Sequence, residues 1–402
     1  MSVDEAKPEE APPTTIDSQG LVKSAPAKSI KLPVYRFAGF SAGAGREGDT
    51  IPIFVKLATT SDAPLFHTLV AGLNGGLTHE AAQIGAAVNL ARANTVLLVC
   101  HADQSADLYV DTTGIRVEMR VKRSVQAGSP VFERDITDVR AMGFIGVEFK
   151  PDDGVLVCFR EGWKFALYFD LSRDNGAFDE KEMGRTLGAL FRALRYDYLY
   201  DALGNEAFVA NLFKAGWFPF AEIITAEFRE IMNHLTAGFD MAEIEGKTIK
   251  AFDRERLEFL EERWRAVPVL KDKMAILKSG LDSFLRGDAV AAIKTLSSEI
   301  EGILQEAHIT IHGKGAKIDS LSEFAKVAGV TKAEGDDTLM FPNQFGQYLG
   351  EYIYAPFDPK TGASAAAGRH PVGHGNAKAE AYTLARALQY ILTIDQLAFY
   401  LG

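Results

Sequence analysis

The sequence predicts a multidomain α+β protein: an antiparallel-rich α+β domain, then helices, then an all-α C-terminal bundle. Two observations support this fold class. Short β-type segments with a side-chain period of two lie within about residues 33–172, whereas from Asp179 apolar residues recur every three or four positions. The chain has 402 residues, enough for two or three domains at roughly 100–200 residues each.

Composition and periodicity set the expected boundaries. Residues 1–29 are rich in Pro, Ala, Glu, Lys and Ser and contain few aromatic residues. Such a segment cannot bury enough apolar surface to offset its ordering entropy, so we expect a disordered tail there. We expect a strand-rich α+β domain at 30–178, a connecting helical region at 179–252 and a helical bundle at 253–402.

In the strand-rich domain, alternating polar and apolar residues and turn sequences mark the expected elements. Val117, Met119 and Val121 alternate with charged residues, which predicts a strand with one buried face. An Ala-rich stretch without proline predicts one helix at 81–93. The expected strands are 51–57, 95–100, 107–111, 116–121, 131–139, 143–149, 155–159 and 164–171.

Helix-capping residues divide the C-terminal half. Ser, Thr, Asp and Asn satisfy free amides at helix starts, proline suits the first turn, and glycine suits the end. A first amphipathic face runs from Met183 to Tyr198. The other expected helices begin at Asn205, 221, Asp253, Pro268, Asp288, Ser320 (with Glu323 as a capping box), 342 and Asn376, and the last one runs to about residue 400.

Charge and hydropathy exclude several classes of protein. The net charge is −11, whereas a protein that binds nucleic acid through its overall charge would be basic. Any nucleic-acid contact must therefore be local. Cys100 and Cys158 lie in apolar strand-like segments and are expected to be core thiols. There is neither a basic-then-apolar signal sequence at the start nor a run of 18 apolar residues, so we expect a cytoplasmic protein without membrane contact.

Two other motifs are weak. The segment 43–48 reads GAGREG, but strand-like residues follow it, whereas a dinucleotide site needs a helix there. His308 and His312 are four residues apart and would share a helix face, but no further metal ligand completes the set. We expect a glycine loop and a polar helix end, with no metal and no cofactor.

The segment 368–375 reads GRHPVGHG and carries the most informative chemistry. Arg369 can grip a phosphate through two parallel N–H bonds. His370 and His374 can transfer protons near neutral pH. This combination suits cleavage of an RNA phosphodiester by its own 2′-hydroxyl. Glycine and proline within the segment permit the bend that would bring Arg369 and His374 together.

This segment resembles the motif of HEPN domains: arginine, a polar residue, three more residues, then histidine. It reads Arg369, His370, three residues and His374, and Gly375 follows as in many members. The upstream segments 264–270, 287–293 and 300–303 and the closing amphipathic helix are also similar to that family. The resemblance covers roughly 253–402.

The resemblance implies a homodimer in which two motifs line one cleft. Active HEPN domains are metal-independent endoribonucleases in toxin–antitoxin, abortive-infection, CRISPR and RNA-processing systems, which suggests a role in antiviral defence or stress response. His374 would act on the 2′-hydroxyl, Arg369 would hold the phosphate, and His370 would orient the substrate or Arg369. The RNA would lie near Gly375 and near a basic rim that includes Arg263 and Arg265.

Two alternatives remain open from the sequence. One is a non-catalytic HEPN-like protein that binds nucleotide or RNA or serves as a dimerisation scaffold. The other is an unrelated enzyme activity in the N-terminal domain, where no Ser/His/Asp or Cys/His pattern is evident. In the ribonuclease hypothesis, the N-terminal domain would sense a regulatory protein partner or restrain the nuclease.

Overall fold

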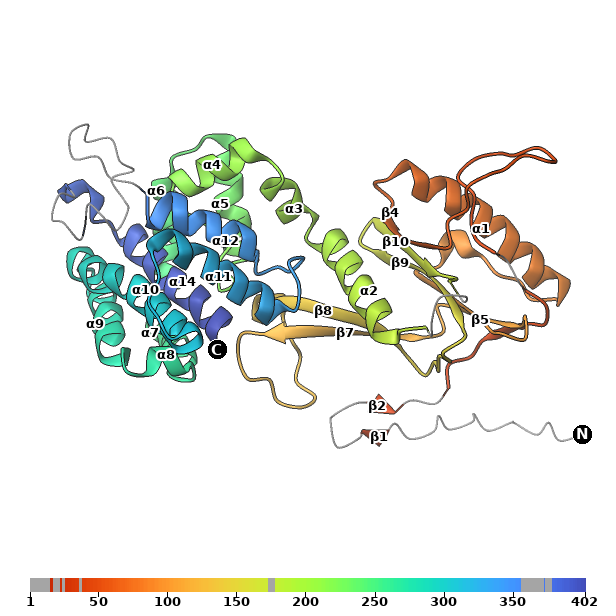
Figure 1. Ribbon diagram of the computed structural model, residues 1–402, viewed down its shortest axis with the longest axis horizontal. Coiled ribbons are helices and arrows are strands. Elements are labelled where there is room, and N and C mark those ends of the chain that lie inside the picture. Colours follow the sequence, from red (N-terminus) through yellow and green to blue (C-terminus); the bar gives the residue numbers. More distant parts are fainter. Residues whose placement is uncertain are drawn as a thin grey trace, which may run out of the picture. The chain divides into compact units, whose positions relative to one another are not determined.

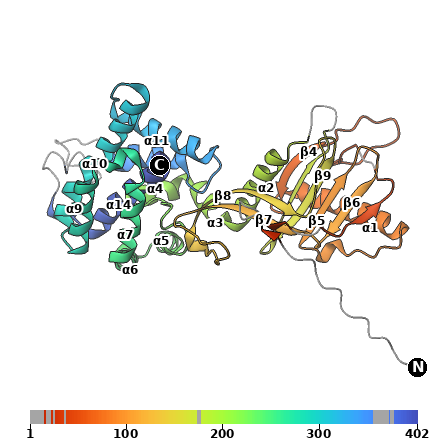
Figure 2. The same cartoon turned by 90° about the horizontal axis from the view of Figure 1, so that it is seen from below.

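The computed structural model describes residues 15–16, 22–23, 26–35, 38–172, 178–355, 372 and 378–402. The chain divides into two compact units. The sheet unit comprises Met1–Glu118 and Val139–Asp197, and the helical unit comprises Met119–Asp138 and Tyr198–Gly402. Figures 1 and 2 show both from two sides.

The sheet unit is built on a six-stranded antiparallel sheet with the order β3-β6-β5-β9-β10-β4. Strands β9 and β10 form the predicted hairpin, and Val157 lies opposite Tyr168. The bounds are β3 Ile30–Leu32, β4 Lys56–Thr60, β5 Thr95–Cys100, β6 Ala106–Val110, β9 Gly154–Glu161 and β10 Lys164–Asp170. A separate two-residue pairing joins β1 (Thr15–Ile16) to β2 (Val22–Lys23), inside the tail expected to be disordered.

A helix packs on each face of this sheet. Helix α1 (Pro64–Gln83) buries Phe66, Leu69 and Leu73 in one core cluster with alternate residues of β5, β6, β9 and β10. Helix α2 (Glu180–Arg195) contacts β4, β9 and β10 and buries Met183 and Leu187. Because side chains alternate along a strand, burial of every residue of β5 requires cover on both faces.

The chain passes between the units through a two-stranded ribbon. Strand β7 (Gly114–Val121) leads out of the sheet unit, and β8 (Ile136–Ile145) leads back to it. The intervening loop ends in the short helix η2 (Glu133–Asp135). We call residues 119–138 the ribbon tip, and this segment packs within the helical unit.

The helical unit contains the ribbon tip and helices. From Arg254 to Leu401, the described residues form helices and turns without a strand, as predicted. The helices are α3 Asp197–Leu203, α4 Glu206–Lys214, α5 Ala226–Ala237, α6 Met241–Ala251, α7 Arg254–Arg265, α8 Pro268–Lys271, α9 Met274–Leu285, α10 Ala289–His312, α11 Ile318–Ala333, α12 Pro342–Tyr348, the π-helix η3 Leu349–Ile353, the 3₁₀ turn η4 Ala379–Ala381 and α14 Leu384–Leu401.

Several predicted helix starts are confirmed by their caps. The side chains of Asn205, Asp253 and Asp288 each accept a hydrogen bond from an amide in the first turn of the following helix. In the sheet unit, Asp179 caps α2 in the same way. These side chains satisfy amides that have no partner inside the helix.

Other predicted elements of the sheet unit are wrong. The helix expected at 81–93 ends at Gln83, and α1 begins instead at Pro64, where Gly72 and Gly75 obscure the helical pattern. The strand expected at 51–57 is only partly present, because β4 begins at Lys56. Before β4, Phe54 forms an isolated bridge with Phe40. The strands expected at 131–139 and 143–149 form the single strand β8.

Three helix starts in the helical unit also differ from prediction. Ser320 lies inside α11, which begins after Lys317 without a side-chain cap. Helix α5 begins at Ala226 because residues 221–225 form turns. The last helix, α14, begins at Leu384 and is capped by Thr383, while Asn376 lies outside the described residues. The helix expected from Pro268 to 286 is divided at 272–273 into α8 and α9.

Substitution of Gly188 tests how closely α2 packs on β8. A Cβ atom there would lie 2.8 Å from Ala141 Cα, so Gly188→Ala must push the helix from the strand. We expect a loss of about 1–3 kcal/mol in the free energy of unfolding of the sheet unit, measured by urea denaturation. The control is Gly75→Ala on exposed α1, where no atom lies within 4 Å and a gain of about 0.5–1 kcal/mol is expected. Equal effects of the two substitutions would contradict this packing.

Candidate functional site

The predicted catalytic residues Arg369, His370 and His374, together with Gly375, lie outside the described residues. The structure describes the ends of the chain segment that carries them, Ala355 and Lys378. It also describes Val372, in the middle of the motif, which is buried with 5% exposure. The site can therefore be built from the elements that hold this segment at each end.

The last described helix before the motif segment is the π-helix η3. A π-turn is rare and frequently marks a functional site. Its buried Tyr352 donates a hydrogen bond to Gln389 Oε1 of α14 at 2.5 Å. Gln389 Nε2 in turn donates to the carbonyl of Ala215 at 3.1 Å. These bonds tie the start of the motif segment to the helix that follows it.

The turn after α4 requires glycine for this arrangement. Gly216 has φ +80°, and a Cβ atom there would lie 2.2 Å from Gln389 Oε1 and 2.4 Å from the Tyr352 hydroxyl. The Gly216 carbonyl also accepts a hydrogen bond from Tyr348 at 3.1 Å. A side chain at this position would separate the three elements that meet there.

On the other side of the motif segment, the described residues lead through η4 to the start of α14. Thr383 accepts a hydrogen bond from the Arg386 amide at 3.2 Å, and Arg386 Nη1 donates to the Ala381 carbonyl at 2.6 Å. Helix α14 packs against α6, α7, α9, α10 and α11. The described residues on both sides of the motif segment thus form hydrogen bonds within the helical unit.

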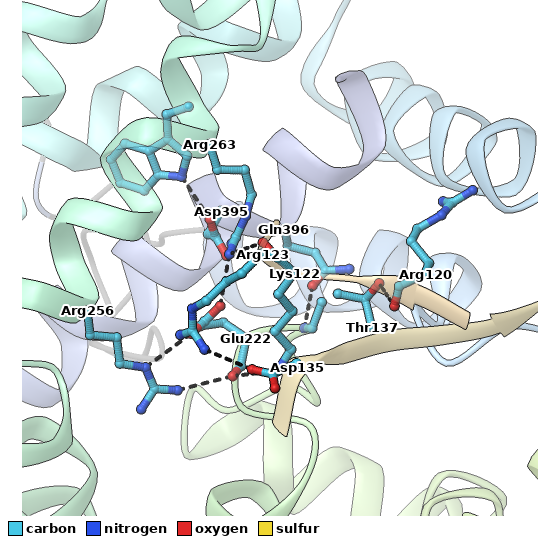
Figure 3. Close-up of polar contacts among 12 residues, drawn as sticks. Arg120, Lys122, Arg123, Asp135, Thr137, Glu222, Arg256, Arg263, Asp395 and Gln396 are labelled. Atoms are coloured by element: carbon cyan, nitrogen blue, oxygen red, sulfur yellow. Dashed lines mark hydrogen bonds and ion pairs between the residues drawn. The ribbon is translucent and has the colours of Figure 1, made fainter. Parts of the chain in front are cut away.

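Arg263, predicted to lie on a substrate-binding rim, is engaged in the interior (Figure 3). Its Nη1 donates to Asp395 Oδ2 at 2.5 Å and its Nη2 to Glu222 Oε2 at 3.1 Å. The guanidinium also stacks 4.3 Å from the centroid of the Phe399 ring. With 13% of its side chain exposed, Arg263 presents its charge to two carboxylates rather than to solvent.

Arg265, the other predicted rim residue, has a side chain that is 58% exposed. Its guanidinium pairs with Glu261 one helical turn earlier on α7. Glu261 is itself largely buried, with 11% of its side chain exposed, and it also pairs with Lys278. The structure thus separates the two arginines: Arg263 points into the unit, and Arg265 lies on its surface.

Glu222 is the centre of a buried charge network that the sequence did not predict (Figure 3). Its side chain is 1% exposed. Oε1 accepts from Arg256 Nε at 3.1 Å and from Arg123 Nη2 at 3.2 Å, and Oε2 accepts from Arg263. Its carbonyl accepts from Lys122 Nζ at 2.9 Å and from Arg256 Nη2 at 3.1 Å. Residues of the ribbon tip and of α7 therefore meet at one carboxylate, and Arg263 links it to Asp395 of α14.

The pKa values of the two buried carboxylates, Glu222 and Asp395, are shifted in opposite directions. Burial acts to raise the pKa of Glu222, but Lys122, Arg263, Arg256 and Arg123 together hold it below its usual range. Burial raises the pKa of Asp395 to about 6, because only Arg263 and the Trp264 indole oppose it. Asp395 is thus the first of the two to accept a proton.

A signal for this network does exist in the sequence. Asp395 and Gln396 stand in a terminal helix whose other residues are almost all apolar. A charged residue on a fully apolar helix needs a buried partner of opposite charge. The sequence alone could not identify Arg263 as that partner.

The minor motifs agree with their ordinary interpretations. No helix follows the glycine loop at 43–48 before α1. His308 and His312 share a face of α10 with ring centroids 4.4 Å apart, and the described residues contain no group of three or more metal-ligating side chains. Cys100 lies on β5 and Cys158 on β9, and they form no disulfide bond with each other. Among the described helices, none is both long and apolar enough to span a membrane.

Lys122 provides a pH test of the network. Burial lowers its pKa from 10.5 to about 8, so below pH 8 the folded state holds an ammonium at a cost that the unfolded state does not have. As pH rises from about 8 to 10.5, Lys122 loses its proton in the folded state but keeps it in the unfolded state, so this cost disappears. The free energy of unfolding of wild type relative to Lys122→Met should therefore increase by about 3 kcal/mol over this range, at about 1.4 kcal/mol per pKa unit.

The measurement is urea denaturation of both proteins at pH 7, 8, 9 and about 10.5. Lys250→Met, at an exposed position on α6, is the control and should show no comparable dependence. A difference between wild type and Lys122→Met that stays constant across this range would contradict the burial of the ammonium.

The chain was also compared with known proteins. No family model, curated protein or solved structure matches it.

Proposed function

We propose that the protein is a metal-independent endoribonuclease of HEPN type, which cleaves single-stranded RNA by attack of the 2′-hydroxyl on the adjacent phosphate. The observation that carries this proposal is the order of the chain. An Arg–polar–x₃–His motif at Arg369, His370 and His374 lies shortly before the buried terminal helix of an all-helical region, which begins at Leu384. This is the position that the resemblance to HEPN domains assigns to the motif.

Each motif residue has one role in this reaction. His374 takes the proton from the 2′-hydroxyl, whose oxygen attacks phosphorus while the bond from phosphorus to the 5′-oxygen breaks. A protonated histidine then returns a proton to that leaving oxygen. Arg369 binds the phosphate through two N–H groups and stabilises the charge that develops on its oxygens. His370 orients Arg369 or the substrate. The products are a 2′,3′-cyclic phosphate and a new 5′-hydroxyl.

The described residues on either side of the motif support this proposal. Tyr352 and Gln389 join the two sides of the segment, and Val372 between them is buried. Anchoring of this kind favours catalysis, because reacting groups must be held in a defined arrangement. Among the predicted rim residues, exposed Arg265 is available to contact RNA, whereas Arg263 is paired inside the unit.

We further propose that two copies pair through the helical bundle so that their motifs line one cleft. The enzyme would act in the cytoplasm, in antiviral defence or a stress response. The sheet unit would respond to a regulatory protein partner. A non-catalytic HEPN-like protein is the alternative. The net charge of −11 favours this alternative, because a negatively charged protein repels the phosphates of RNA.

Purified protein should cleave single-stranded RNA in EDTA and leave 2′,3′-cyclic phosphate ends, while DNA of the same sequence stays intact because it lacks the 2′-hydroxyl. His374→Ala should lower the rate by about 10²–10⁴. Arg369→Ala should lower it by about 10²–10³. Arg369→Lys should restore only part of the activity, since an ammonium cannot form the two-pronged contact.

The matched controls are His79→Ala and Arg92→Ala, two exposed positions of the sheet unit. Both should cleave RNA at the wild-type rate. If His374→Ala and Arg369→Ala keep wild-type activity, the site assignment is wrong. If they lose activity together with a large fall in melting temperature, Arg369 and His374 are structural, and the non-catalytic alternative is favoured.

A further inference from the structure

A cavity of about 330 Å³ lies in the helical unit between the ribbon tip and the start of α5, away from the chain ends that hold the motif segment. One wall comes from η2 and the residue before it, and the other from the first turn of α5. The lining residues are Phe132, Glu133, Arg134, Thr225, Ala226 and Arg229.

The α5 wall offers hydrogen-bond donors without acceptors. The side chain of Thr225 makes no capping bond to α5, and the Ala226 and Glu227 amides donate to no other group of the described residues. Thr225 itself is 8% exposed, and its hydroxyl has no hydrogen-bond partner in the described part of the chain. A helix N-terminus with free amides favours an anion.

Two arginines add positive charge to the same cavity. Within the described ranges, neither Arg134 nor Arg229 forms an ion pair, unlike Arg123, Arg256 and Arg263 nearby. Arg134 lies 5.1 Å from the centroid of the Phe132 ring, and Arg229 lies 4.1 Å from that of Tyr198. Both are exposed, so their N–H groups are free to bind a ligand.

We propose that this cavity binds a nucleotide through its phosphate group. The phosphate would lie at the start of α5, where it would accept hydrogen bonds from the Ala226 and Glu227 amides and from the Thr225 hydroxyl. Arg134 and Arg229 would neutralise its charge and donate further hydrogen bonds. This set of donors matches the several oxygens of a terminal phosphate.

The remaining lining residues indicate what is attached to the phosphate. Phe132 is 52% exposed, and a base can stack on its ring. The Glu133 carboxylate can accept hydrogen bonds from a ribose hydroxyl or an amino group of the base, and it disfavours additional phosphates. The volume, about 330 Å³, lies at the lower end of small-ligand cavities, which suits a nucleoside monophosphate. None of the described lining residues belongs to the motif, and the proposal does not rest on the ribonuclease function.

Isothermal titration calorimetry of the full chain with adenosine 5′-monophosphate, inorganic phosphate and adenosine tests this site. The monophosphate should bind most tightly, phosphate more weakly, and adenosine weakest because it lacks the anion. Arg134→Ala and Arg229→Ala should each weaken monophosphate binding roughly 10- to 100-fold, as expected for a lost charged hydrogen bond. Phe132→Ala should weaken the monophosphate but leave phosphate binding unchanged.

Arg92→Ala is the control with an exposed arginine elsewhere and should bind like wild type. His374→Ala should also bind like wild type, which separates this site from the proposed catalytic site. Absence of monophosphate binding, or wild-type binding by Arg134→Ala and Arg229→Ala, would overturn the proposal. Equal affinities for phosphate and monophosphate would overturn the assignment to a nucleotide.

Discussion

The helical unit depends on one buried carboxylate. Glu222 is 1% exposed and accepts hydrogen bonds from arginines of the ribbon tip and of α7. Removing a carboxylate from water is costly, so this arrangement is stable only while its cations remain in place. Arg263 extends the network to Asp395 and hence to α14. Three segments far apart in the sequence are thus held by mutual charge compensation rather than by apolar contact alone.

The same network contacts residues next to the proposed nucleotide cavity and on the helix that follows the motif segment. Thr225 and Ala226, which follow Glu222 closely, form one wall of the cavity, and Arg134 of the other wall precedes Asp135, which pairs with Arg123. Helix α14 carries Asp395 and, one and a half turns earlier, Gln389, which binds Tyr352 at the base of the motif segment. A change at Glu222 should therefore reach the cavity and α14 together.

The sequence predicted those parts of the fold that depend on local chemistry. Strand β5 was predicted at its observed bounds, and Asn205, Asp253 and Asp288 cap the helices that they were expected to cap. The predictions were wrong where local sequence patterns do not determine the bounds of a helix. Glycines interrupt the apolar pattern of α1, and Ser320, predicted to cap a helix, lies inside α11. The motif at Arg369 and His374 is local and therefore visible, whereas Arg263 has a long-range partner, Asp395, that no local pattern specifies.

Hydrogen exchange followed by mass spectrometry on Glu222→Gln tests the central role of this carboxylate most directly. The variant removes the one carboxylate that Arg123, Arg256 and Arg263 share, and breaking a buried ion pair commonly costs about 3–5 kcal/mol. Amides of the ribbon tip and of α14 should together exchange at least about a hundredfold faster than in wild type. Glu230→Gln, which breaks an exposed pair with Lys247, should leave them unchanged. Wild-type protection of either segment in Glu222→Gln would contradict the account.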